Sequence, residues 1–256
     1  MLKIAVSGKG GAGKSTLAAN LVYCLTKKET PVFAVDADPD ANLGLTLGLD
    51  PEKVLSLRPL CELQEVIDAK NAGGGTFVDL NPDVSDILEN YTLRDGLIRF
   101  LKMGGIKQGG SSCYCKENSF LNAVLTNVLL DRPEPVVLDM SAGIEHLTRG
   151  TARGIQLMLV VVEPTRAGLS TALAVDRLAG ELAVPQVFFI GNKTRAPEDR
   201  QFLFDALPPE RIAGMIPFTE KALERARLTE ISGFKPEDLL PGMEAIFEKI
   251  SGGGCF

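Results

Sequence analysis

A glycine-rich stretch near the start of the chain has the residue types and spacing of a phosphate-binding loop. Gly8 and Gly13, followed by Lys14 and Ser15, meet the pattern G-x-x-x-x-G-K-[ST]. Glycines let successive backbone N–H groups turn inward, where they and the following helix N-terminus bind an anion. We expect Lys14 to reach the β- and γ-phosphates of a nucleotide and the Ser15 hydroxyl to ligate Mg²⁺. The residues expected to line this phosphate site are Gly8, Lys9, Gly10, Gly11, Ala12, Gly13, Lys14, Ser15 and Thr16.

The elements around this loop follow from hydrophobic patterns. An apolar run at 4–6 predicts a strand before the loop, and 17–25 predicts a helix after it, which is the order such a loop needs. Nearly continuous Val, Ile, Leu and Phe predict buried strands at 31–35, 76–80, 135–138, 155–162, 185–190 and 212–216. Helical patterns alternate with these runs. The sequence therefore predicts an α/β fold with an open, mostly parallel sheet and helices on both faces.

Length, charge and composition narrow the functional classes. The 256 residues suit one domain over 1–256, with an insertion at about 50–132 on one face. The net charge of −6 argues against nucleic-acid binding. The chain has no apolar run of about 18 residues and begins directly with a strand, so we expect neither a membrane span nor a signal peptide, and a cytoplasmic location. The five cysteines then point to metal or redox chemistry rather than to disulfides.

Three aspartates follow predicted strands and are expected beside the phosphate loop. Asp36 and Asp38 alternate at the end of one strand, where one can support Mg²⁺ through water and the other can orient an attacking water. Helix capping is the alternative role for this stretch. Asp139 ends the run Pro-Val-Val-Leu-Asp, a buried strand that delivers a carboxylate to the Mg²⁺ shell. Gly143 follows in a loop whose backbone N–H is expected to approach the γ-phosphate.

The nucleotide base has its own candidate residues. Asn192 and Lys193 end a predicted strand, and the Asn amide can read a base edge. In the N-K-x-D pattern of guanine-binding proteins, the final carboxylate accepts protons from guanine, but this chain has Arg195 there. The sequence therefore favours ATP and ADP over guanine nucleotides. Pro217 and Phe218 are expected to pack against the base, although a plain turn explains them equally well.

Lys9 is a second lysine that an ordinary phosphate loop does not need. The form G-K-G-G-x-G-K-[ST] resembles the deviant Walker A motif of the MinD, ArsA and nitrogenase-iron-protein class of ATPases. This resemblance implies that Lys9 reaches across a dimer to the partner's nucleotide, where a cation stabilises the transferring phosphoryl group. It also implies that Asp38 lies near the γ-phosphate. The residues expected to carry ATP hydrolysis are Lys9, Lys14, Asp38 and Asp139.

Two cysteines lie close together in the expected insertion. Cys113 and Cys115 form a Cys-x-Cys pair, which on an extended segment places both thiols on one side. Two thiolates fill half of a four-ligand site, and a symmetric dimer supplies the other half. Four sulfurs suit Zn²⁺ or, with planar geometry, Ni²⁺. From spacing alone, metal binding and chance placement are about equally well supported.

Several motifs together resemble one family within this class. The runs 36–40, 109–121 and 139–151 occur in order after the phosphate loop and resemble the nickel-insertion ATPases that mature carbon monoxide dehydrogenase. In that family ATP drives dimerisation, the two Cys-x-Cys pairs share one metal ion, and nickel passes to the client. The resemblance thus implies a homodimer that uses ATP, Mg²⁺ and Ni²⁺ (or Zn²⁺). Its client would be carbon monoxide dehydrogenase or the related acetyl-CoA synthase.

Two other functions compete with this interpretation. A MinD-like regulator or scaffold would need a basic amphipathic helix at the C-terminus, but residues 237–250 carry four acidic side chains, Glu237, Asp238, Glu244 and Glu248. A redox ATPase like the nitrogenase iron protein would hold an iron–sulfur cluster between subunits, with two widely separated cysteines from each. An anaerobic visible spectrum distinguishes a cluster from a Zn²⁺ or Ni²⁺ site.

Overall fold

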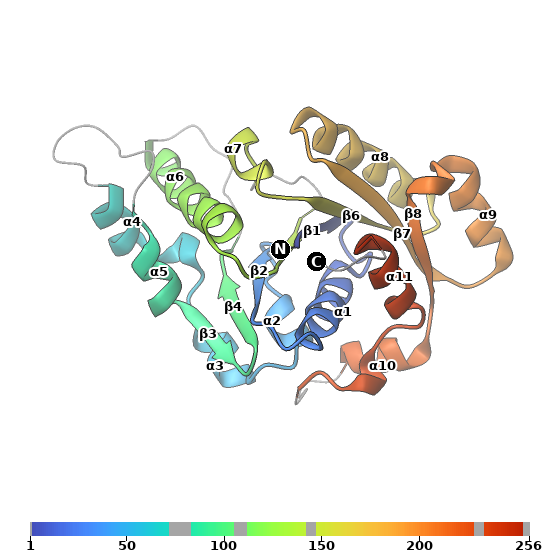
Figure 1. The fold of residues 1–256 in the computed structure, drawn as a ribbon, viewed down its shortest axis with the longest axis horizontal. Coiled ribbons are helices and arrows are strands. Elements are labelled where there is room, and N and C mark those ends of the chain that lie inside the picture. The colour runs from blue at the N-terminus through green and yellow to red at the C-terminus, as the bar shows by residue number, and fades with distance from the viewer. Residues whose placement is uncertain (1, 72–82, 105–111, 142–146, 228–232, 253–256) are drawn as a thin grey trace.

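One eight-stranded sheet organises the molecule (Figure 1). The computed structural model describes residues 2–71, 83–104, 112–141, 147–227 and 233–252. The strand order is β3-β4-β2-β5-β1-β6-β7-β8, and every pair is parallel except β3 with β4. The strands are β1 (Lys3–Gly8), β2 (Val32–Ala37), β3 (Thr92–Asp95), β4 (Ile98–Lys102), β5 (Val136–Met140), β6 (Leu157–Val162), β7 (Gln186–Thr194) and β8 (Ile212–Pro217).

Helices cover both faces of this sheet and create two hydrophobic cores. One core lies under α4 (Gln64–Asn71), α5 (Ser85–Asn90), α6 (Ser112–Thr126), α7 (Arg149–Ala152), α8 (Arg166–Glu181) and α9 (Pro197–Ala206). The other lies under α1 (Lys14–Thr26), α2 (Leu43–Thr46), α3 (Pro51–Ser56) and α11 (Met243–Ile250), with α10 (Glu220–Arg227) at its margin. Alternation along β1 serves both cores, since Ala5 faces the first and Ile4 and Val6 face the second. The predicted fold class is thereby confirmed.

The strand β1 lies where the sheet's connections change direction. It pairs with β5 on one side and β6 on the other. The chain runs from β1 to β2 toward one edge and from β6 to β8 toward the other. Ligands of such sheets bind outside the carboxyl ends of the strands at this switch point. The phosphate loop follows β1 directly and therefore sits at the expected place.

The segment 50–132 differs from the sequence prediction. Rather than covering only one face, it also adds β3 and β4 to the sheet, where β4 pairs in parallel with β2. The predicted strand at 76–80 lies outside the described residues. Both β3 and β4 were missed because charged residues interrupt their apolar pattern, for example Arg94 and Arg99.

The Cys-x-Cys pair also differs in its local structure. Cys113 and Cys115 belong to the first turn of α6, so the prediction of an extended segment is wrong. Apolar residues farther along this helix, including Phe120 and Val124, are buried in the core and stabilise the helical backbone.

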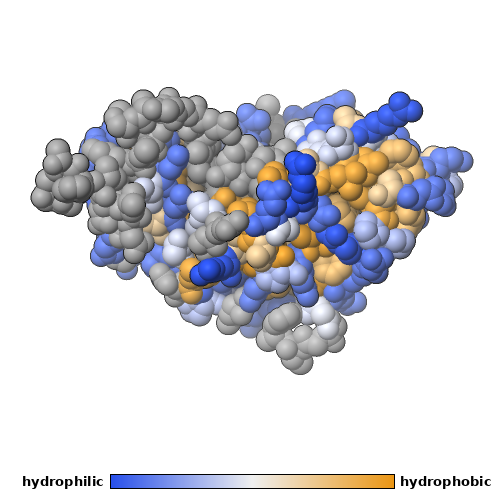
Figure 2. All heavy atoms as spheres, turned by 90° about the horizontal axis from the view of Figure 1, so that it is seen from above, coloured by the Kyte–Doolittle hydropathy of each residue, from blue (hydrophilic) through white to orange (hydrophobic). Residues whose placement is uncertain are grey.

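The surface and the helix lengths add two observations. Figure 2 shows an apolar area, bordered by hydrophilic side chains, in the half of the molecule that holds α8 and α9. Among the described residues of these two helices, the exposed large apolar side chains are Leu173 of α8 and Phe204 of α9, at 47% and 42% exposure. Scattered exposed apolar residues are ordinary on protein surfaces, and we assign no interface to this area.

Among the described residues, no helix has both the length and the apolar character needed to span a membrane.

Candidate nucleotide site

Glycine is required at two positions of the loop between β1 and α1. Gly8 has φ 144° and Gly13 has φ 99°, both in a region that favours glycine. A Cβ at Gly8 would lie 2.4 Å from the Val161 carbonyl oxygen, and one at Gly13 would lie 2.4 Å from Asn192 Nδ2. The loop is thus packed tightly against β6 and β7, and Gly13 begins α1 with its N-terminus at the loop.

A cavity of about 630 Å³ opens beside this loop. Its volume falls within the range of about 300–1,000 Å³ that is typical of small-molecule sites. Of the residues predicted for the nucleotide, it is lined by Gly10, Gly11, Gly13, Lys14, Ser15, Thr16 and Asp38. The structure therefore brings the phosphate loop and one of the predicted carboxylates together around one space.

The two lysines of the loop have different surroundings. Lys14 is buried, and its Nζ lies 3.3 Å from Oδ2 of Asp38, with side-chain exposures of 8% and 15%. Lys9 is half-buried, and within the described part of the chain its ammonium makes no ion pair or hydrogen bond. A phosphate entering the cavity would compete with Asp38 for Lys14. Lys9 would not have to break an ion pair of this kind in order to bind a phosphate.

Asp36 and Asp139 lie side by side at the centre of the sheet. They are register partners on β2 and β5, and both are fully buried. Burial, and after it the charge of the neighbouring Asp139, raise the pKa of Asp36 to about 7. Asp36 keeps two acceptor contacts, from the N–H groups of Leu43 at 2.8 Å and Asp38 at 3.3 Å. It therefore also fixes the turn into α2, which agrees with the alternative capping role of this stretch.

Asp139 is the less satisfied carboxylate of this pair. Burial raises its pKa to about 6, although the Ser15 hydroxyl and the Lys14 ammonium act in the opposite direction. Within the described residues, no contact of either Asp139 oxygen has the geometry of a full hydrogen bond, although the Ser15 hydroxyl lies close enough to lower the pKa. A buried carboxylate of this kind is costly unless a cation balances it. Its oxygens and the Ser15 hydroxyl are hard donors, so these residues fit Mg²⁺.

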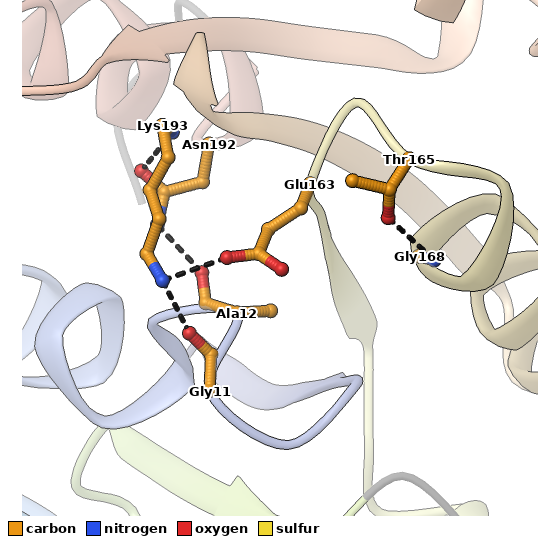
Figure 3. Close-up of polar contacts among 7 residues, drawn as sticks. All are labelled: Gly11, Ala12, Glu163, Thr165, Gly168, Asn192 and Lys193. Atoms are coloured by element: carbon orange, nitrogen blue, oxygen red, sulfur yellow. Dashed lines mark hydrogen bonds and ion pairs between the residues drawn. The ribbon is translucent and has the colours of Figure 1, made fainter.

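Asn192 and Lys193 contact the phosphate loop rather than line the cavity (Figure 3). Asn192 Nδ2 donates to the Ala12 carbonyl at 2.7 Å, and Lys193 Nζ donates to the Gly11 carbonyl at 2.6 Å. Base reading by Asn192 stays a prediction. The Phe218 ring lies under the Arg195 guanidinium at 4.1 Å, and Pro217 lines a separate hollow of about 230 Å³. Gly143 lies outside the described residues.

The far wall of the cavity contains residues that the sequence analysis missed. It is lined by Arg225 of α10, Phe234 and Asp238, and Arg225 Nη1 lies 2.5 Å from Oδ2 of Asp238. Asn20 of α1 is fully buried at the cavity, and its Oδ1 accepts from the Leu240 N–H at 2.7 Å. The sequence did contain one signal for Asn20, because it is a lone polar residue in the apolar stripe of α1. Arg225 and Asp238 meet only through tertiary folding.

Four of the five cysteines are either core residues or candidate metal ligands. Cys24 and Cys61 are buried in the cores, as predicted. Burial raises the pKa of the Cys24 thiol to about 11, which keeps it protonated. No group of three or more His, Cys, Asp or Glu side chains suited to a metal occurs among the described residues. The Cys113 and Cys115 side chains lie outside that description.

Sequence relatives share nearly the whole chain. The chain is 35% identical over 260 residues to "Carbon monoxide dehydrogenase accessory protein CooC" of Rhodospirillum rubrum, with 97% of each sequence covered. It is 36% identical over 230 residues to an uncharacterized ATP-binding protein of Methanocaldococcus jannaschii, covering 87% of this chain and 88% of that protein.

Solved structures share the fold at lower identity. The MinC:MinD cell division protein complex of Aquifex aeolicus aligns with a TM-score of 0.67 at 19% identity, covering 100% of this chain and 97% of that one. A ParA family ATPase of Chlorobium tepidum TLS aligns with a TM-score of 0.66 at 17% identity, covering 99% and 98%. The family model for the CobQ/CobB/MinD/ParA nucleotide binding domain matches residues 3–228. With its phosphate loop, parallel sheet and these matches, the chain belongs to the CobQ/CobB/MinD/ParA nucleotide-binding family, on the branch that includes the carbon monoxide dehydrogenase accessory protein.

Proposed function

We propose that this protein is an ATP-hydrolysing nickel metallochaperone of the cytoplasm. It serves the maturation of carbon monoxide dehydrogenase, or of the related acetyl-CoA synthase, as an ATP- and metal-dependent homodimer. The observation that carries the proposal is the surroundings of Lys9. This loop lysine makes no ion pair or hydrogen bond within the described part of its own chain, whereas Lys14 already lines the cavity. The printed name of the Rhodospirillum rubrum relative supports the choice of client.

Each side chain has a task in the proposed reaction. The loop N–H groups and Lys14 bind the triphosphate, which releases Asp38 from its contact with Lys14. Asp38 then orients the attacking water opposite the ADP oxygen that leaves. The Ser15 hydroxyl and Asp139 would hold Mg²⁺, which when bound would neutralise charge on the β- and γ-phosphates. Lys9 of the partner subunit would supply the last positive charge in the transition state.

The cargo site is completed by the same dimer. Cys113 and Cys115 supply two thiolates per chain, and two chains together supply the four ligands that a tetrahedral or planar ion requires. Both cysteines lie in the first turn of α6. Hydrolysis would loosen the dimer and release Ni²⁺ (or Zn²⁺) to the client.

A MinD-like regulator is the second candidate, because the fold matches MinD over the whole chain. Such a protein binds a membrane surface through a basic C-terminal helix. The last helix here, α11, instead carries Glu244 and Glu248, and Glu244 forms an ion pair with Lys27 at 3.1 Å. Vesicles of anionic lipid separate the two functions, since a regulator would bind them in the presence of ATP. A redox ATPase would show the visible absorption of an iron–sulfur cluster.

Activation of a nickel-free client tests the proposal. Nickel-free carbon monoxide dehydrogenase is incubated with the protein, Ni²⁺ and ATP, and carbon monoxide oxidation is followed. We expect activation that depends on ATP and is lost in Lys14→Ala. The control variant Glu244→Gln, which breaks only the surface pair with Lys27, should activate as well as the unchanged protein. Equal activation without the protein or without ATP would refute the proposal.

A further inference from the structure

The carbonyl side of the phosphate loop has hydrogen-bond donors of its own (Figure 3). When the loop N–H groups point at phosphates, the loop carbonyls point away and need partners. Lys193 Nζ donates to Gly11 at 2.6 Å and Asn192 Nδ2 donates to Ala12 at 2.7 Å, both from the end of β7. Two consecutive peptide groups of the loop are thus held from behind.

A third residue holds the lysine in place. Glu163 follows β6, and its Oε1 lies 2.7 Å from Lys193 Nζ. Its backbone is fixed by the turn into α8, since the Glu163 carbonyl accepts the Thr165 N–H at 2.7 Å. A Cβ at Gly168 would lie 2.6 Å from the same carbonyl oxygen, so α8 packs closely against this turn. Glu163 therefore presents its carboxylate to Lys193 from a rigid base.

The backbone of Lys193 indicates that this arrangement is enforced. Lys193 has φ 58°, a left-handed conformation that is uncommon for a residue other than glycine. Its N–H donates to Asn192 Oδ1 at 2.9 Å, so both polar atoms of the Asn192 amide are used. Unfavourable backbone conformations persist where surrounding contacts determine them. Here those contacts end on the phosphate loop.

We propose that Asn192, Lys193 and Glu163 are positioning residues that hold the phosphate loop in its anion-binding conformation. This inference rests on the proposed function, namely that the cavity binds ATP. Asn192 then acts on the triphosphate through the loop. Its donation to the Ala12 carbonyl polarises the peptide group whose N–H belongs to Gly13, and hydrogen bonds in series strengthen one another. Glu163 acts indirectly, because its ion pair with Lys193 keeps the Lys193 ammonium hydrogen-bonded to the Gly11 carbonyl.

Three probes distinguish positioning from base reading by Asn192. Calorimetry measures the binding of Mg-ATP, Mg-GTP and inorganic tripolyphosphate to the unchanged protein and to Asn192→Leu, which removes the donor without adding charge. Positioning predicts that binding of all three weakens by the same factor, about 10–100-fold. Base reading predicts weaker ATP binding with unchanged tripolyphosphate binding, and that result would overturn the inference. Failure of the unchanged protein to bind ATP would instead contradict the proposed function.

A charge exchange tests the outer pair. The double variant Glu163→Lys, Lys193→Glu keeps the ion pair and its net charge but places a carboxylate, which has no donor, against the Gly11 carbonyl. We expect the exchange to recover the thermal stability that Glu163→Lys alone loses, while tripolyphosphate binding stays at least about 10-fold weaker than in the unchanged protein. Recovery of both properties would show a purely structural pair and overturn the role of Lys193. Glu244→Gln serves again as the control and should change neither property.

Discussion

The two sides of β1 differ in how completely the single chain satisfies its polar groups. On the β6–β7 side, Lys193, Asn192 and Glu163 contact one another or the loop carbonyls at 2.6–2.9 Å. On the β5–β2 side, Asp139 is fully buried and neither of its oxygens completes a hydrogen bond within the described residues. The difference indicates that a single chain supplies all the contacts that support the phosphate loop. On the β5–β2 side, in contrast, the Asp139 carboxylate needs a bound cation to balance its charge.

The candidate cargo residues lie on the same incomplete side. Helix α6 packs on the core that contains residues of β2 and β5, and Cys113 and Cys115 lie in its first turn. Two thiols per chain make half of a four-ligand site. We infer that the cations act on this side of β1, whereas the nucleotide cavity also takes in Arg225, Phe234 and Asp238, which follow β8.

The largest effect is expected from the two loop lysines. Lys9→Ala should leave ATP binding nearly intact but slow hydrolysis by about 10³-fold and prevent ATP-linked dimerisation, because a cation supplied by a partner acts on the transition state. Lys14→Ala should abolish binding itself. Calorimetry gives the binding, and phosphate release gives the hydrolysis. An equal loss of binding in both variants would contradict the cross-dimer role of Lys9.

A smaller effect is expected when the buried charge of Asp139 is removed. Asp139→Asn should raise the free energy of unfolding at pH 8 by about 1–3 kcal/mol, because an uncompensated buried charge is lost. The same change should abolish Mg²⁺-dependent hydrolysis. Asp36→Asn is the matched control, since Asp36 accepts two backbone N–H groups and an Asn there would turn its NH2 donor toward one of them, which offsets the gain from neutralisation. Urea unfolding measures both variants, and equal stability changes would remove the contrast between the two carboxylates.

The same carboxylates predict a pH dependence. The pKa values of about 7 for Asp36 and about 6 for Asp139 lie above their usual value of 3.8, so the folded chain binds more protons than the unfolded chain between those limits. Their contribution to stability is complete below about pH 4 and is lost as the pH rises through about 6 to 7. Asp139→Asn should flatten this loss, and Mg-ATP should bind more tightly over the same rise. Parallel pH profiles for both proteins would contradict the assignment.

Local patterns predicted the parts of the site that lie close together in sequence. The loop from Gly8 to Thr16 and the strand ending in Asp139 are each continuous motifs, and the structure brings their neighbourhoods together. The support of the loop could not be predicted in this way. Asn192 contacts Ala12 across 180 positions of sequence, and Glu163 meets Lys193 across 30. Such pairings depend on strand order rather than on a motif.

The Cys-x-Cys pair shows the other kind of failure. The spacing of the two cysteines predicted an extended segment, whereas α6 begins at Ser112 and includes both cysteines. The helix is stabilised by apolar residues that begin only at Phe120, so the polar start of α6 carries no helical pattern of its own. A two-residue motif gives ligand types but not the backbone that presents them.

The most direct test is the metal stoichiometry of the nucleotide-bound protein. Ni²⁺ is titrated with ATP present, and sedimentation gives the size of the particle. The proteins compared are the unchanged protein, the double variant Cys113→Ala, Cys115→Ala, and the control Cys255→Ala, which removes the one cysteine of the sequence to which no role is assigned. The account predicts one ion per dimer in the unchanged protein and the control, with ATP and Ni²⁺ raising each other's affinity by the same factor. The double variant should bind no bridging ion. One ion per dimer with unchanged affinity in the double variant would contradict the account.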